Sequence, residues 1–220
     1  MKSFKKSLGV FVFLFLSFIL WTLAISFIDP EAIGPNGSSV GFASLNGWFH
    51  SVTGVHMTLY HITDWAGLVP VAVGFGFAVL GLVQWIKRKN ILKVDFNILT
   101  LGGFYVFVLG FYLLFEELVV NYRPILINGY LEASYPSSTT LLVLCVMPTA
   151  ILQLNARIKN KVFKRIVSLL IISFTVFMVV GRLVSGVHWL TDIIGGILLS
   201  GSLVTLYYSI NKPIVFETYS

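Results

Sequence analysis

The chain has 220 residues, of which 57% are hydrophobic and only 11% are charged, and its formal net charge is +6. Soluble domains carry about 25% charged residues, so this chain has too few to cover a surface that faces water. Its length suits one compact domain, and its single cysteine, Cys145, can form no internal disulfide bond. The composition therefore predicts a membrane protein with a single domain, residues 1–220.

Long apolar segments recur along the chain. The first, residues 8–28, has no charge and is long enough to cross about 30 Å of hydrocarbon at about 1.5 Å per residue. It is longer than the roughly 7–15 apolar residues of a signal peptide and has no clear cleavage site, which favours a membrane anchor over a cleaved leader. We expect an all-α integral membrane bundle of six transmembrane helices. The other five segments are residues 65–86, 96–120, 137–156, 166–180 and 189–210, and the fifth of the six is the shortest.

The longest hydrophilic stretch lies between the first two segments, at residues 29–64. Residues 45–60 within it mix apolar, aromatic and small polar residues, which predicts a short amphipathic helix at the membrane interface. Three histidines there, His50, His56 and His61, share no helical face well, and no cysteine or carboxylate pair completes a ligand set. An interfacial lid or plain packing is favoured over a metal site.

The positively charged residues are distributed unevenly. If six segments alternate across the membrane, 13 of the 15 Lys and Arg residues fall on one side. By the positive-inside rule that side is cytoplasmic, so we expect a multi-pass protein of the cell membrane with both termini in the cytoplasm. The asymmetry accounts for the net charge without a nucleic-acid partner. The 13 residues are Lys2, Lys5, Lys6, Lys87, Arg88, Lys89, Lys93, Arg157, Lys159, Lys161, Lys164, Arg165 and Lys212.

Two arginines, Arg123 and Arg182, are left on the opposite side. Charges near membrane depth are costly unless they are paired or functional. Each arginine could snorkel or form a structural ion pair. The residues around them are chemically specific, however, and favour a functional site.

The segment after residue 180 contains the first part of that site. His188 and Asp192 are four residues apart, so on one helix they would lie within hydrogen-bond reach. A carboxylate that holds one imidazole nitrogen leaves the other nitrogen free to act as a nucleophile. Arg182 precedes the histidine by six residues, and its fork of donors suits a phosphoryl group.

A second patch precedes the fourth apolar segment. Pro136 can begin a helix, with Ser137 and Ser138 as its cap or first-turn residues. Free amides and hydroxyl groups at a helix N-terminus bind anions. Together with Arg123 and the His188 patch, they predict phosphoryl transfer through a phosphohistidine at the outer end of the helices. No cofactor and no metal is expected.

These patches resemble those of the type-2 phosphatidic acid phosphatase family, which is related to bacterial acid phosphatases and vanadium haloperoxidases. The family pattern is a Lys, six residues and Arg-Pro; a Pro-Ser-Gly-His; and a Ser-Arg, five residues, His, three residues and Asp. The resemblance covers residues 96–210, and the six-span layout fits the whole chain. The matching residues are Arg123, Pro124, Pro136, Ser137, Arg182, His188 and Asp192.

The resemblance implies a role for each matching polar residue. His188 would be the nucleophile and Asp192 its orienting group, while Arg123, Arg182 and Ser137 would bind phosphate. The implied partner is a lipid phosphate within the bilayer. The implied activity is that of a membrane lipid phosphatase.

Three positions depart from the family pattern. Glu116 stands in place of the lysine, Thr139 in place of the second histidine, and Gly181 in place of the serine. The second histidine is the family's general acid, and its loss typically costs 10²–10⁴-fold. A leaving group that needs little protonation would reduce that loss, so a lipid diphosphate such as a polyprenyl diphosphate is favoured over phosphatidic acid.

Several alternatives stay open. The chain could be a catalytically impaired protein that binds lipid phosphates, or a lipid phosphotransferase that uses the same site. A channel is disfavoured because the polar groups gather at one end of the helices. Glu116 is seven residues before Arg123 and could form an ion pair with it, act as a proton donor with a raised pKa, or bridge a metal to substrate.

Overall fold

The computed structural model describes the backbone of residues 2–217 and the side chains of residues 4–211, so the side chains of Lys2 and Lys212 lie outside it. Every named element in this range is a helix, which confirms the expected all-α fold. The elements are α1 (Lys2–Phe27), η1 (Pro35–Gly37), α2 (Ala43–Thr53), α3 (Met57–Ala66), α4 (Leu68–Arg88), η2 (Ile91–Lys93), α5 (Phe96–Glu117), α6 (Ser138–Arg157), α7 (Lys161–Val184) and α8 (Leu190–Glu217).

Within the described residues, six helical segments are long and apolar enough to cross a membrane, as the sequence predicted. The second consists of α3 and α4 in succession, Met57–Arg88, and the others are the long helices α1, α5, α6, α7 and α8. The fifth span was expected to be the shortest, which is wrong because α7 has 24 residues. Its first turns contain Lys161, Lys164 and Arg165, whose long side chains can reach the membrane boundary from a helix that begins inside it.

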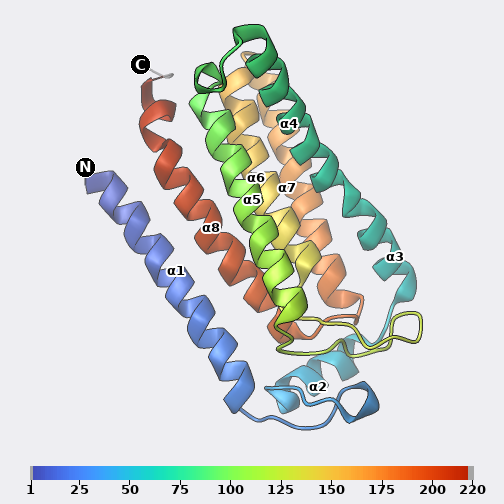
Figure 1. Ribbon diagram of the computed structural model, residues 1–220. Coiled ribbons are helices and arrows are strands. Elements are labelled where there is room, and N and C mark those ends of the chain that lie inside the picture. Colours follow the sequence, from blue (N-terminus) through green and yellow to red (C-terminus); the bar gives the residue numbers. More distant parts are fainter. Residues whose placement is uncertain (1, 218–220) are drawn as a thin grey trace.

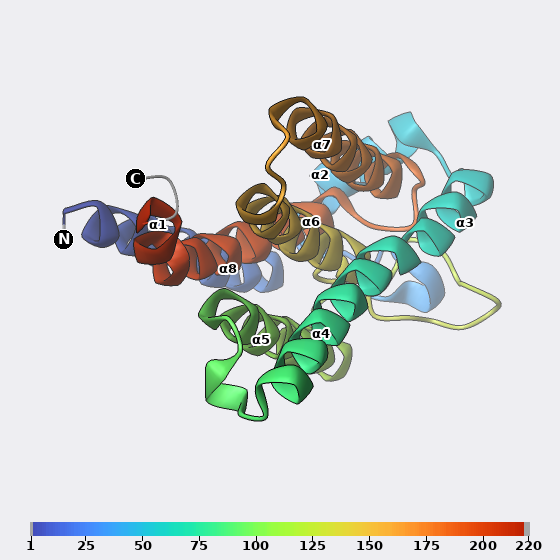
Figure 2. The ribbon, with the colours of Figure 1, turned by 90° about the horizontal axis from the view of Figure 1, so that it is seen from above.

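Helix α6 lies at the centre of the bundle. It packs against α4, α5, α7 and α8, and α1 lies outside along α8 (Figure 2). Half of the apolar window of α6 and half of that of α8 is buried, whereas the other spans present most of theirs outward. The outward side chains are large and apolar, as a helix surface in contact with lipid requires.

The two ends of the bundle differ in chemistry. The start of α1, the end of α8 and the α4–α5 and α6–α7 connections lie at one end, which we call the basic end (Figure 1). Helix α2 and residues 118–137 lie at the other, which we call the site end (Figure 1). This arrangement is what six alternating spans require. The chain is therefore a multi-pass membrane protein.

The interfacial segment forms two helices, α2 and α3, where the sequence predicted one. The break begins at Gly54, whose φ of 68° favours glycine. The broken segment rests on the α7–α8 connection: His56 N donates to Ser185 O over 2.9 Å, and a Cβ on Gly186 would lie 2.0 Å from Gly54 O. Tertiary contact, which local periodicity does not encode, therefore divides the helix.

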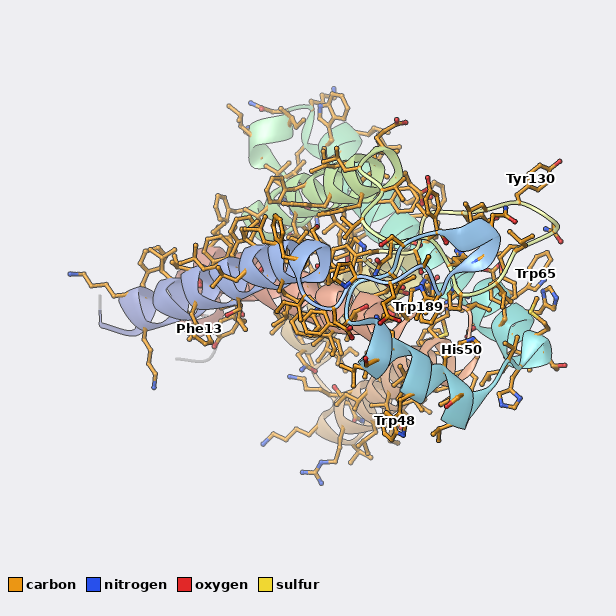
Figure 3. The ribbon with its side chains drawn as sticks, turned by 90° about the horizontal axis from the view of Figure 1, so that it is seen from below. Phe13, Trp48, His50, Trp65, Tyr130 and Trp189 are labelled. Carbon is orange, nitrogen blue, oxygen red and sulfur yellow. The ribbon has the colours of Figure 1, made fainter. Side chains whose placement is uncertain are left out.

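Aromatic side chains at the site end separate into two groups. Trp48, Trp65 and Tyr130 point outward from α2, the end of α3 and the α5–α6 connection, and they are mostly exposed (Figure 3). Trp189 is buried near the centre with the His50 ring 5.5 Å away (Figure 3). Exposed Trp and Tyr residues favour the boundary between hydrocarbon and water, so this end lies at a membrane surface.

Candidate active site

The predicted site residues come from five parts of the chain that meet at the site end. Arg123 lies in the α5–α6 connection, Ser137 and Ser138 at the start of α6, and Arg182 in the last turn of α7. His188 lies in the short α7–α8 connection and Asp192 in the first turn of α8. Helix α3 adds a sixth element to the same region through its packing on α7.

His188 is buried and contacted on both ring nitrogens. Its Nδ1 is 3.0 Å from Ser134 Oγ, and Ser134 Oγ donates to Asp192 Oδ2 over 2.5 Å. Its Nε2 is 3.2 Å from Arg182 Nη2. A chain of polar contacts therefore runs from Asp192 through Ser134 and the imidazole to Arg182.

These contacts fix the tautomer of His188. A guanidinium only donates, so Nε2 is the accepting nitrogen and the ring proton is on Nδ1, where it donates to Ser134 Oγ. Burial lowers the pKa of His188 well below its usual value, and the positive charges of Arg123 and Arg182 lower it further. The imidazole is therefore neutral near pH 7 and has its lone pair on Nε2.

The direct bond expected between His188 and Asp192 does not form, because Nδ1 and Oδ2 are 3.8 Å apart and Ser134 lies between them. The four-residue spacing assumed a continuous helix. Instead, α8 begins at Leu190, and Asp192 Oδ2 accepts from Trp189 N over 2.9 Å at the helix start. Asn121 Nδ2 also donates to Asp192 Oδ1 over 3.3 Å, so the carboxylate is held from three sides.

Arg182 is only 1% exposed, and side chains of α3 contact its guanidinium. Asp64 Oδ1 is 3.5 Å from Arg182 Nη1, and the Tyr60 ring centre is 5.0 Å from Cζ. The carboxylate offsets part of the cost of burying the charge, and the ring adds a cation–π contact. The interfacial segment thus contacts the predicted phosphate-binding arginine directly.

Arg123 is paired with a residue to which sequence reasoning assigned no role. Its Nε is 3.1 Å from Glu132 Oε2, and Arg123 N donates to Glu132 O over 3.0 Å. The expected ion pair with Glu116 is therefore wrong. Helix α5 ends at Glu117, so the two-turn spacing from Glu116 does not continue, and the chain instead doubles back to align Arg123 with Glu132.

The two guanidinium groups retain unused donors. Nε and Nη1 of Arg123 and Nε and Nη1 of Arg182 are buried without a hydrogen bond of adequate geometry, although Asp64 and Glu132 supply opposite charge nearby. A buried donor without an acceptor costs about 1–3 kcal/mol, and more when it is charged. An oxyanion with several acceptor atoms, such as a phosphoryl group, would satisfy these donors.

A small pocket lies beside His188. Ser134 and Ser138 line it, and Glu116 is the one carboxyl group among the described side chains in its wall. The amides of the first turn of α6 face the N-terminal end of that helix, as in any α-helix. Ser137 is fully buried and accepts from Thr140 Oγ1 over 3.0 Å.

Thr139 does not join this cavity. It lines a larger groove beside α4 and lies close to Gly67, whose Cβ position would be 3.7 Å from Thr139 Cγ2. The structure thus brings His188, Asp192, Arg182, Ser134 and Ser138 together but directs Thr139 away. A replacement for the family's second histidine is therefore not found at that position.

The three histidines of the interfacial segment are held by separate contacts. His50 Nε2 is 3.2 Å from Gly186 O, His56 Nε2 is 2.8 Å from Thr53 O, and the His61 ring packs on Tyr60. Among the side chains that the structure describes, no group of three His, Cys, Asp or Glu residues is arranged to hold a metal ion. Packing thus accounts for their positions.

Sequence reasoning missed Ser134, Asp64, Tyr60 and Glu132. Ser134 lies two residues before Pro136 and has no motif of its own, and it meets His188 across 54 residues of chain. Asp64 and Tyr60 come from the interfacial segment, which was interpreted as a lid or packing. Only the unexplained excess of acidic residues on the site side could have suggested partners for the arginines.

We expect Ser134→Ala to lower kcat about 10–100-fold, because neutral His188 then loses the acceptor that holds its proton on Nδ1. Phosphate release from a lipid diphosphate measures this change, and KM should change little. Ser202→Ala is the matched control, since Ser202 is a buried serine in α8 that bonds only Leu199 O. Equal kcat values for the two variants would contradict a role for Ser134 in the chain of contacts between Asp192 and His188.

The fold defines a class, the helical multi-pass membrane proteins, and comparison with known proteins identifies the family within it. A sequence profile of the PAP2 superfamily matches residues 6–215, and the chain therefore belongs to that superfamily. The crystal structure of a transmembrane PAP2-type phosphatidylglycerolphosphate phosphatase from Bacillus subtilis has a similar fold, with a TM-score of 0.51 and 20% identity over 93% of this chain and 96% of that one. A search of curated proteins gave no significant match.

The resemblance stated from the sequence is thus confirmed at the level of the superfamily and of the fold. Family membership supports lipid phosphatase activity in general. The substrate and the roles of single residues go beyond this coarse assignment.

Proposed function

We propose that the protein is a lipid phosphatase that hydrolyses a lipid phosphate or diphosphate, with polyprenyl diphosphate favoured, at the extracytoplasmic face. The observation that carries the proposal is the state of His188: its Nε2 bears the lone pair and lies 3.2 Å from Arg182. Arg182 and Arg123, whose positive charges both act on His188, each carry donors without a hydrogen bond. A phosphoryl group held by both arginines would present its phosphorus atom to Nε2.

In the first chemical step, Nε2 of His188 attacks phosphorus and the bond to the leaving group breaks. The leaving group departs with the electron pair, while the Nδ1 proton stays on the imidazole and its positive charge is balanced by Asp192 through Ser134. In the second step water attacks phosphorus, the phosphorus–nitrogen bond breaks, and Nε2 regains its lone pair. The proton of the water passes to solvent or to the released phosphate.

The orientation rests on charge. The basic end carries the connections that contain most of the Lys and Arg residues, which favours the cytoplasm for that end and for both termini. The site end then faces the extracytoplasmic side.

His188 and Asp192 serve as the catalytic pair, and Arg123, Arg182, Ser137 and Ser138 bind phosphate.

The missing general acid supports the diphosphate preference. Thr139 cannot protonate a leaving alcohol near pH 7, and it lines the groove beside α4. A diphosphate expels a phosphate, which is a stable leaving group, whereas a monoester expels an alkoxide. We propose Glu116, which lines the cavity, as a modulator of this step.

We expect kcat/KM for a polyprenyl diphosphate to exceed that for phosphatidic acid by about 10²-fold or more, the range in which general acids act. Phosphate release from a panel of lipid mono- and diphosphates measures the ratio, with the His188→Ala protein as the background control. Equal rates on both classes of lipid would contradict the conclusion that the site lacks a general acid because Thr139 replaces the family's histidine.

The same panel separates the competing functions. A lipid-phosphate binding protein would retain affinity for the lipids but release no phosphate above the His188→Ala background. A phosphotransferase would release little free phosphate until an alcohol or a second lipid phosphate is added as acceptor. The presence of His188, with its contacts to Ser134 and Asp192 and with two arginines nearby, favours an enzyme over a protein that only binds the lipid.

A further inference from the structure

A second and larger space lies beside the catalytic cavity. It is a groove of about 2180 Å³, counted out to its open side, between α4 on one side and α5 and α6 on the other. We call it the lateral groove. Figure 1 shows why it exists: α4 runs obliquely, close to α5 at the basic end and away from it toward α3.

The lateral groove is continuous with the catalytic cavity. Tyr112, Ser138 and Leu141 line both spaces, so the cavity beside His188 opens into the groove at the site end. A lipid whose phosphate lies at His188 would therefore find a path for its hydrocarbon chain along α4. Continuity with the cavity favours the substrate's own chain as the occupant.

The chemistry of the groove also fits hydrocarbon. Its middle is lined by apolar side chains and glycines, and Tyr105, the phenol at mid-depth, directs its hydroxyl to Thr149 Oγ1 at 3.1 Å. The ionisable carboxyl among its lining residues, Asp64, lies at the site end. The middle of the groove thus has little to offer a polar ligand.

The groove is longer than one leaflet of a bilayer. It extends along α4 from Leu68 to Trp85, 17 residues that span about 26 Å at about 1.5 Å per residue. Half of a hydrocarbon core is about 15 Å. Gly102 on α5 is ten residues from Tyr112, or about 15 Å along the helix, so the groove continues past the depth at which a chain confined to one leaflet ends.

We propose that the lateral groove holds a single hydrocarbon chain longer than one leaflet and thereby selects long-chain polyprenyl substrates over short-chain ones. This inference rests on the proposed phosphatase function for its headgroup site. Past Gly102, a long chain gains contacts that a short chain cannot make. Trp85, Ile91 and Val94 line the far end of the groove, at the basic end.

Two adjacent glycines on α5 provide a matched test. A Cβ at either Gly102 or Gly103 meets no atom within 4 Å, and both positions are exposed, but only Gly102 lines the groove. A Cβ at position 102 therefore meets no atom, and the ring of Gly102→Phe would extend from a position that lines the groove at mid-depth. Phe at position 103 adds the same side chain to the outer face of the same helix.

We expect Gly102→Phe to lower kcat/KM for undecaprenyl diphosphate about tenfold and to leave that for farnesyl diphosphate within about twofold. The loss is modest because the chain exchanges protein contacts for lipid contacts of similar strength. Gly103→Phe should change neither value. The proposal would be overturned if Gly102→Phe left the ratio of the two kcat/KM values unchanged. An equal loss of kcat/KM on both substrates would also overturn it, and that is the result expected if a partner helix occupies the groove.

A binding experiment keeps this inference separate from the enzymatic one. A polyprenyl diphosphate with a photoreactive group at the chain end is irradiated with the full-length His188→Ala protein in lipid nanodiscs. We expect labelling of α4 and α5 near Trp85 and Ile98, and loss of that labelling in a protein that also carries Gly102→Phe. Labelling spread over α1 and α8 would overturn the proposal that the chain lies in the lateral groove. Labelling as expected, without phosphate release by the unmodified protein, would overturn only the proposed phosphatase function.

Discussion

Replacing His188 with Ala is expected to lower phosphate release from a lipid diphosphate by about 10⁴-fold or more, because the attacking nitrogen is removed. The affinity for the same lipid should fall far less, since both arginines remain in place to bind its phosphate. Single-turnover assays with a labelled terminal phosphate measure the first quantity, and they also detect the phosphohistidine in the unmodified protein. Equilibrium binding to the purified protein in nanodiscs measures the second.

His56→Ala is the matched control for this variant. His56 is exposed at the start of α3 and its ring contacts only Thr53 O, so its loss should leave turnover unchanged. Residual turnover of His188→Ala within tenfold of the unmodified protein would show that another group attacks phosphorus. Absence of a labelled histidine, together with undiminished hydrolysis, would lead to the same conclusion.

The second large effect is expected at Arg182. Arg182→Gln should lower kcat/KM for the diphosphate about 10²–10³-fold, because the guanidinium both binds the phosphoryl group and stabilises the charge that develops on it. Arg182→Lys should recover only part of the loss, since a lysine keeps the charge but not the planar fork of donors. Steady-state phosphate release over a range of lipid concentrations separates the effects on kcat and KM.

The burial of Arg182 makes a folding control necessary. Arg182→Gln leaves Asp64 without its charged partner, although that carboxylate is half exposed and can be hydrated. We expect the thermal unfolding temperature of Arg182→Lys to stay close to that of the unmodified protein, with Arg88→Gln as an exposed arginine control at the basic end. Full activity of Arg182→Lys would show that the site needs only a positive charge there.

The arrangement separates the apolar surface of the bundle, which suits hydrocarbon, from the polar site that is proposed to bind phosphate. The apolar surfaces of α1, α5 and α7 face outward, while the predicted site residues lie at the site end, where α3 contacts Arg182. A charge buried at this end avoids the centre of the bilayer, where its cost is greatest. On the proposed function, a lipid anchored by its chain would expose only its headgroup to the site.

The sequence by itself determined the six spans, because a continuous apolar run of about 20 residues has few alternatives in a membrane. It also predicted, from charge and from spacing, that Arg123, Arg182 and His188 lie at the same end of the bundle. These predictions depended on local composition and on spacing within one segment. They needed no knowledge of which helices are neighbours.

Only the tertiary structure decided which side chains meet. Ser134 lies between His188 and Asp192, Glu132 takes the place expected for Glu116, and α3 brings Asp64 to Arg182. Each of these contacts joins residues across a helix end, a loop or a long stretch of chain, where helical spacing no longer sets the distance between side chains. The lateral groove likewise depends on the oblique path of α4, which packing between helices determines and no local pattern encodes.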